Sequence, residues 1–144
     1  MHWLAGRLGA LSERHARYAE LRSARPAEAS PPTEEVTARA AFFRDLSGLV
    51  DEIAAHEGVV AAFAEHDGLL VALSGAAESA DAMAAMAATV VAPARRAAVA
   101  LDLGPVEQLV LVGGRRKLAL VVVGDLSIGI LAPAEARLAQ LLKR

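Results

Sequence analysis

Residues 117–131 of the chain read KLALVVVGDLSIGIL. Gly124 and Asp125 separate two apolar runs, which is typical of a hairpin with a two-residue turn. The first run is apolar at every position from Leu118 to Val123, so both faces of this strand need to be covered. An antiparallel strand with two apolar faces indicates a sheet that lies between helices.

A second hairpin is expected in the middle of the chain. Asp67 and Gly68 separate two predicted strands, at residues 59–65 and 69–73. An Asp-Gly pair favours the type I′ turn, because both central residues of that turn need a positive φ. A further strand is predicted over residues 106–112. Since the connections within hairpins are too short for parallel crossovers, these strands predict a five-stranded, mainly antiparallel sheet.

Helices are expected before, between and after these strands. Apolar periodicity predicts helices over residues 3–22, 33–56 and 79–103, and Pro133 is suited to open a last helix over 133–142. The fold class is therefore α+β. A five-stranded antiparallel sheet is flanked by helices on both faces in the order α-β-β-α-β-β-β-α, and a helical extension precedes it at the N-terminus.

Each of the three long helices has a stripe that it is predicted to bury. Ser79 is the expected N-cap of the third helix, which we expect to bend at Pro93 rather than break. The stripes are Leu4, Leu8, Leu11, Tyr18 and Leu21 in the first helix, Val36, Ala40, Phe43, Leu46, Val50 and Ile53 with Phe42 and Leu49 in the second, and Met83, Met86 or Ala87, Val90, Ala94, Ala97 and Leu101 in the third.

A Pro-rich stretch divides the chain into parts of opposite charge. Residues 1–25 are predicted to form an amphipathic basic helix, with five Arg and two Glu and a net charge of +3. Residues 26–32 contain three prolines and are predicted to be an extended linker. Residues 33–144 are predicted to form the main domain, and residues 26–144 carry a net charge of −5.

Composition excludes several classes of protein. The chain has 144 residues, of which 55% are hydrophobic, 3% aromatic and 34 are Ala, so one core of small side chains is expected. A net charge of −2 argues against nucleic-acid binding driven by bulk charge. The lack of Cys excludes disulfides, Cys-ligated zinc and thiol catalysis, and it fits a cytoplasmic location. We expect no transmembrane span, because no apolar stretch reaches ~20 residues.

The sequence contains no motif for catalysis or cofactor binding. Both glycine-rich phosphate-binding patterns are missing, and no Ser lies in a nucleophile elbow. His2, His15, His56 and His66 lack the i, i+4 spacing of a helical zinc site, so a surface position is expected for each. We therefore expect a protein that is not an enzyme and holds no metal or cofactor.

The element order and its turns resemble the Roadblock/dynein light chain family over about residues 36–144. Gly58-Val59 leads into the first strand, the run from Glu65 to Leu69 is similar to the family's hairpin, and Asp81 precedes an Ala-rich helix. The run from Leu103 to Leu109 is similar to the family's passage from helix to strand, and residues 117–132 are similar to its closing hairpin.

This resemblance implies the profilin/Roadblock-like fold and a homodimer in which the long middle helix and the third strand meet their symmetry mates. It also implies a non-enzymatic regulator or scaffold that binds a small Ras-like GTPase, as MglB-like members do, and modulates GTP hydrolysis. Two alternatives stay open. One is a structural adaptor of the dynein light chain type without effect on nucleotide, and the other is a sensory module that holds a small ligand in an apolar cavity.

Two sets of residues are candidates for contacts with other chains. The alternative is that they are ordinary core residues or solvated surface residues. The strand at 106–112 is expected at a sheet edge with little charge to protect it. The N-terminal helix could pack on its own domain or dimer mate, dock on a partner, or lie on an anionic membrane. The expected dimer contacts are Met83, Met86, Val90, Ala94, Val106, Gln108 and Val110, and the candidate partner contacts are Arg95, Arg96, Arg115, Arg116, Trp3 and Tyr18.

Overall fold

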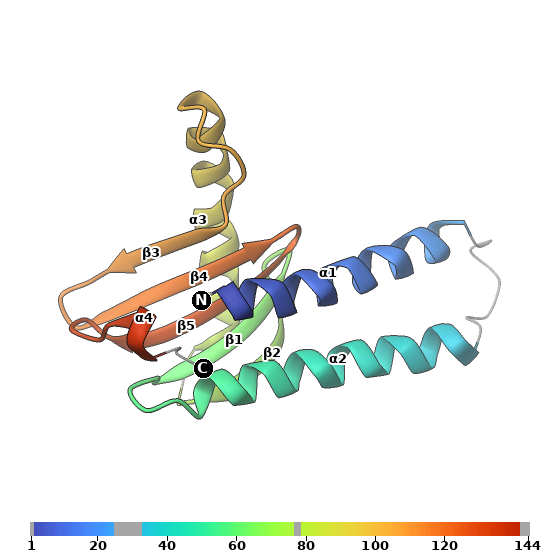
Figure 1. Cartoon of the computed structure of the whole chain (residues 1–144), viewed down its shortest axis with the longest axis horizontal. Coiled ribbons are helices and arrows are strands. Elements are labelled where there is room, and N and C mark those ends of the chain that lie inside the picture. The colour runs from blue at the N-terminus through green and yellow to red at the C-terminus, as the bar shows by residue number, and fades with distance from the viewer. Residues whose placement is uncertain (1, 25–32, 77–78, 142–144) are drawn as a thin grey trace.

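The computed structural model describes residues 2–24, 33–76 and 79–141 (Figure 1). The predicted linker at 26–32 lies outside the described residues. Within them the chain forms four helices and five strands. The elements are α1 (His2–Ser23), α2 (Thr33–Ala54), β1 (Ala61–His66), β2 (Leu69–Gly75), α3 (Ala80–Ala100), β3 (Gln108–Val112), β4 (Arg116–Val123), β5 (Leu126–Pro133) and α4 (Leu138–Leu141).

The five strands form one antiparallel sheet in the order β2-β1-β5-β4-β3, as the sequence predicts. Each hairpin pairs its own strands, and β1 pairs with β5 to join the two halves. In that pairing His66 lies opposite Leu126, so the β1–β2 turn and the β4–β5 turn lie at the same end of the sheet. β2 and β3 are the edges.

Helices cover both faces of the sheet, which explains the two apolar faces of β4. On one face, Ala119 and Val121 belong to a core cluster with α1 and α2. On the other, Leu120 and Val122 belong to a second cluster with α3. Figure 1 shows α1 and α2 side by side on one face of the sheet and α3 on the opposite face. The C-terminal turns of α1 and the N-terminal turns of α2 project past the sheet. The predicted sheet between helices is confirmed.

The β1–β2 turn has the conformation that Asp-Gly predicts. Asp67 has a φ of 50° and Gly68 a φ of 80°. The side chain of Glu65, which is 4% exposed, supports this turn. One carboxylate oxygen accepts a hydrogen bond from the Gly68 amide at 2.8 Å, and the other accepts one from the Ser127 hydroxyl on β5. This buried carboxylate therefore links the turn to the neighbouring strand.

One expectation about a helix end is wrong, and the expected N-cap residue of α3 is confirmed without its side-chain cap. Pro133 does not open a helix; it is the last residue of β5, opposite Arg116. The pairing of β5 with β1 already ends at Leu131, opposite Ala61, so a proline at position 133 removes no hydrogen bond between these two strands. The last described helix begins only at Leu138. Ser79 stands at the N-cap of α3, but its side chain makes no capping hydrogen bond. Its carbonyl accepts the Met83 amide at 2.9 Å instead.

The buried stripe of α2 is shorter than predicted. Val36 is 52% exposed and Ala40 is exposed, because the first turns of α2 extend beyond the sheet. Further along, Phe42 is buried while Phe43 is only half-buried.

α3 runs as one helix through Pro93. No helix among the described residues is both long and apolar enough to cross a membrane.

The packing of Phe63 on Gly129 yields a first prediction. The two residues face each other across β1 and β5, and a Cβ atom at position 129 would overlap the ring of the fully buried Phe63. Gly129→Ala should therefore lower the free energy of unfolding by ~1–3 kcal/mol, as overpacked cores do. Urea denaturation measures this loss. Gly114→Ala is the matched control, since nothing lies within 4 Å of its added methyl group.

Candidate functional site

The outer edge of β3 is apolar and uncovered. β3 pairs with β4 on one side and with no described strand on the other. None of its residues, Gln108–Val112, is charged. Val110 is 45% exposed, Leu111 46% and Val112 66%. An open strand edge with exposed aliphatic side chains is a template for pairing with another chain.

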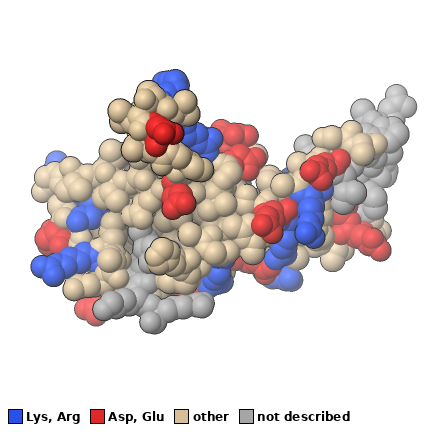
Figure 2. All heavy atoms as spheres, turned by 45° about the horizontal axis from the view of Figure 1, so that its top comes forward, with Lys and Arg blue, Asp and Glu red and all other residues tan. Residues whose placement is uncertain are grey.

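The end of α3 continues this apolar surface. α3 packs on the sheet through Ala84, Ala87 and Val91 and then projects past it (Figure 1). Beyond the sheet Val99 is 83% exposed, Leu101 68% and Leu103 70%. We call the six residues Val99, Leu101, Leu103, Val110, Leu111 and Val112 the apolar edge. Figure 2 shows acidic and basic side chains interleaved along the projecting part of α1 and α2, whereas most of the remaining surface in that view is uncharged.

The predicted dimer residues do not all lie on one surface. Met83 packs against the α3 core cluster, and Val90, Ala94 and Val106 are half-buried. Met86, which is 60% exposed, and Gln108 and Val110 are exposed.

The stripe that α3 buries is Ala84, Ala87, Val91 and Ala98, so the predicted helix face was wrong by about one residue. The exposed residues after the helix, Leu101 and Leu103, were missed as surface residues.

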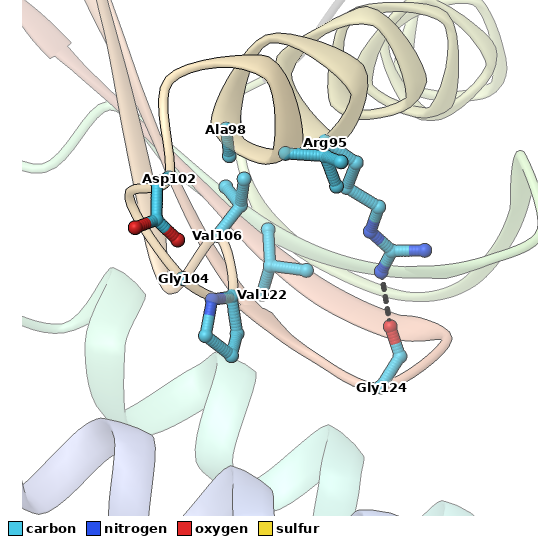
Figure 3. Close-up of a pocket in the computed structure, with 9 residues that line it drawn as sticks. Arg95, Ala98, Asp102, Gly104, Val106, Val122 and Gly124 are labelled. Carbon is cyan, nitrogen blue, oxygen red and sulfur yellow. Dashed lines mark hydrogen bonds between the residues drawn. The ribbon is translucent and has the colours of Figure 1, made fainter.

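An open pocket of about 670 Å³ lies between the end of α3 and the sheet (Figure 3). Ala98, Val106 and Val122 form an apolar wall, and Asp102 lies near one rim. At the other side the Arg95 guanidinium donates a hydrogen bond to the Gly124 carbonyl in the β4–β5 turn. Arg95 therefore ties α3 to that turn.

Three further arginines are exposed candidates for partner contacts. Arg96 lies on α3, and Arg115 and Arg116 lie at the turn between β3 and β4. None of the three side chains forms an ion pair with a described residue. The Arg116 carbonyl accepts a hydrogen bond from the Gly113 amide within the turn, and the Arg115 carbonyl accepts one from the Ala134 amide after β5, while both guanidinium groups stay in solvent.

The N-terminal helix is part of the main core. Leu4, Leu8 and Leu11 are buried in the cluster that α2 and the sheet share. α2 carries five acidic and two basic side chains, a net charge of −3 that complements the basic α1. Two of the acidic side chains of α2 pair with α1, Glu52 with Arg7 and Asp45 with Arg14, the latter pair at 2.9 Å.

Trp3 and Tyr18 differ in their surroundings. Trp3 is half-buried, stacks on His56 with a centroid separation of 6.5 Å and has the Arg7 guanidinium 5.9 Å from its ring. Tyr18 lines a second pocket of about 470 Å³ between α1, α2 and the sheet. The apolar side chains that line this pocket include Phe42, Phe43, Val71 and Leu126.

Three polar side chains meet at the wall of the second pocket. The Nε2 atom of His66 lies 2.8 Å from Oδ2 of Asp125 and 3.2 Å from Nε2 of His15. Partial burial raises the pKa of Asp125, but its hydrogen bond to His66 and the nearby imidazoles outweigh burial and hold the pKa below its ordinary value. Sequence reasoning missed this cluster because it weighed each histidine alone. A partial signal was present, since His66 directly precedes the Asp67-Gly68 turn and Asp125 lies in the other predicted two-residue turn.

The fold and the apolar edge define a small α+β domain with a surface suited to protein contact. The sequence matches the Roadblock/LC7 domain family over residues 47–132. The chain therefore belongs to the Roadblock/LC7 domain family, as its resemblance to Roadblock and dynein light chain proteins indicates. A search of curated proteins gives no significant match.

Solved structures share this fold. A Roadblock/LC7 domain from Streptomyces avermitilis is 29% identical, with 67% of this chain and 84% of that one aligned at a TM-score of 0.61. Myxococcus xanthus MglB is 16% identical, with 69% and 77% covered at a TM-score of 0.63. An MglB described with a tetrameric arrangement is 17% identical, with 81% and 85% covered at a TM-score of 0.59.

The position of α1 in the core yields a second prediction. Leu8→Ala removes a fully buried side chain and should lower the free energy of unfolding by ~2–5 kcal/mol. Denaturation in urea measures the loss. Val36→Ala is the control, because Val36 is 52% exposed on the first turns of α2, away from the apolar edge, and its truncation should change stability by no more than ~0.5 kcal/mol. Equal stability of the two variants would mean that α1 is a dispensable appendage.

Proposed function

We propose that the chain is a non-enzymatic, homodimeric regulator or scaffold that binds a small Ras-like GTPase and modulates its GTP hydrolysis. The observation that carries the proposal is the apolar edge, which leaves β3 and the end of α3 without a partner among the described residues of a Roadblock/LC7 domain. Membership in this family supports a regulatory role.

The first part of the proposal is self-association through β3. Two copies related by a twofold axis can pair their β3 strands antiparallel, which extends two sheets into one and places Val110 near the axis. The same contact covers Leu111 and brings the exposed end of α3 toward the second copy. That another protein of this fold is described with a tetrameric arrangement supports assembly of such domains.

The second part concerns the GTPase. Arg115 and Arg116 leave two guanidinium groups in solvent beside the apolar edge, and Arg96 adds a third on α3. These three exposed arginines are complementary to an acidic patch on a partner, because complementary charges speed association and fix the orientation of the two proteins. Trp3 is left out of the proposed contact set, since it packs on His56 and Arg7.

The dimer is tested by Val110→Lys. Two added charges would face each other near the twofold axis, so association should weaken by ~10-fold or more. Sedimentation equilibrium measures the dissociation constant. Val36→Lys is the matched control, because Val36 is similarly exposed, at 52%, but lies on α2. If both variants associate like the unmodified chain, or if that chain is monomeric, the proposed dimer is wrong.

GTPase binding is tested with purified Ras-like GTPases from the same organism, each loaded with GDP or with a GTP analogue. One of them should bind, and the double variant Arg115→Ala, Arg116→Ala should weaken binding by ~10-fold or more. Arg44→Ala on α2 serves as the control, because its side chain is 78% exposed. The hydrolysis rate with and without the chain then separates a regulator from a scaffold. Binding to none of these GTPases would refute the proposed function.

A further inference from the structure

Three segments far apart in the sequence bring His15, His66 and Asp125 together. His66 ends β1 and Asp125 lies in the β4–β5 turn, and the pairing of β1 with β5 places these two turns side by side. α1 crosses the same end of the sheet, where the Ser12 hydroxyl reaches the Val123 carbonyl at 3.4 Å. His15, one helical turn further along, therefore faces both turns.

A proton on Nε2 of His66 can serve both of its neighbours only as a shared, three-centre hydrogen bond. Nε2 of His66 lies within hydrogen-bond distance of both Asp125 and Nε2 of His15. A ring nitrogen carries either one proton or one lone pair. If Nε2 of His66 donates to Asp125, it has no lone pair left to accept a proton from His15. If it accepts from His15, it turns a lone pair toward the carboxylate. One cation placed among the three atoms would attract all of their lone pairs.

The spacing of the three atoms suits a zinc ion. Zn–N bonds of ~2.0–2.1 Å in a tetrahedral site place neighbouring ligand atoms ~3.3 Å apart. The two imidazole nitrogens are 3.2 Å apart, and all three ligand atoms lie within 4.8 Å of one another. The Asp125 side chain is 53% exposed in its turn, so it is free to rotate and close the wider separation within the cluster toward the tetrahedral spacing.

The surroundings of the cluster also suit a metal. The His15 ring stacks on Phe42 with a centroid distance of 5.1 Å, which holds its orientation. Nδ1 of His66 lies 3.8 Å from Oδ2 of Asp67, and a carboxylate on the far nitrogen is a common support for a metal-bound imidazole. The open side of the cluster faces the 470 Å³ pocket, so a water molecule can supply the fourth ligand.

We propose that His15, His66 and Asp125 form a site for one divalent transition-metal ion, best suited to zinc, that clamps α1 to the two hairpin turns. Two imidazoles and one carboxylate supply borderline ligands of the kind zinc prefers. Because one ligand comes from α1 and two from the sheet, the ion would hold the N-terminal helix in place. The site is independent of the proposed GTPase function, since none of its ligands belongs to the apolar edge.

The site is tested by titrating zinc chloride into the tag-free, metal-depleted full chain in a calorimeter. One ion should bind per chain, and zinc should raise the melting temperature in a way that a chelator reverses. His15→Ala, His66→Ala and Asp125→Asn should each weaken binding by ~10-fold or more. His2→Ala is the control, because His2 is exposed and lies outside the cluster.

Cobalt(II) provides a readout that depends on no variant. Bound to the unmodified chain, it should give the intense visible absorption of a four-coordinate ion, and one equivalent of zinc should abolish it. The proposal is overturned if zinc does not bind, if cobalt shows only the weak absorption of the hydrated ion, or if His15→Ala and Asp125→Asn bind zinc like the unmodified chain.

Discussion

Burial of β4 on both faces determines where the other elements of the domain lie. Ala119 and Val121 require a cover on one side, and Leu120 and Val122 require one on the other. α1 and α2 provide the first cover and α3 the second. These helices pack on the middle strands of the sheet. The outer edge of β3 therefore stays uncovered, and the end of α3 projects past the sheet. The apolar edge is thus a consequence of how the core is covered.

The α1–α2 pair adds an electrostatic constraint to this packing. The basic charge of α1 is matched by the acidic α2, and two ion pairs join the helices. Exposed pairs of this kind contribute little stability by themselves, typically below ~1 kcal/mol. The buried leucines of α1 supply most of the attachment, and the ion pairs favour one orientation. That orientation brings His15 to the end of the sheet where His66 and Asp125 meet.

Local rules explain which features were predictable from the sequence. The Asp67-Gly68 turn, the two-sided run in β4 and the edge position of β3 each follow from backbone preference or residue alternation. The helix face of α3 was misassigned because Ala and Met differ little in polarity, so only tertiary packing selects Ala84, Ala87 and Val91. Pro133 fits a strand end as well as a helix start. The histidine cluster depends on long-range pairing, which no spacing within one segment encodes.

The central claim is that β3 is a pairing edge which a second copy covers. Hydrogen exchange of the β3 backbone amides, followed as a function of protein concentration, tests this most directly. The amides of β3 that point away from β4 should be protected at high concentration and should exchange rapidly after dilution, because pairing with a second β3 strand occupies them. Rapid exchange of these amides at every concentration, in a chain whose β4 and β5 amides stay protected, would contradict the claim.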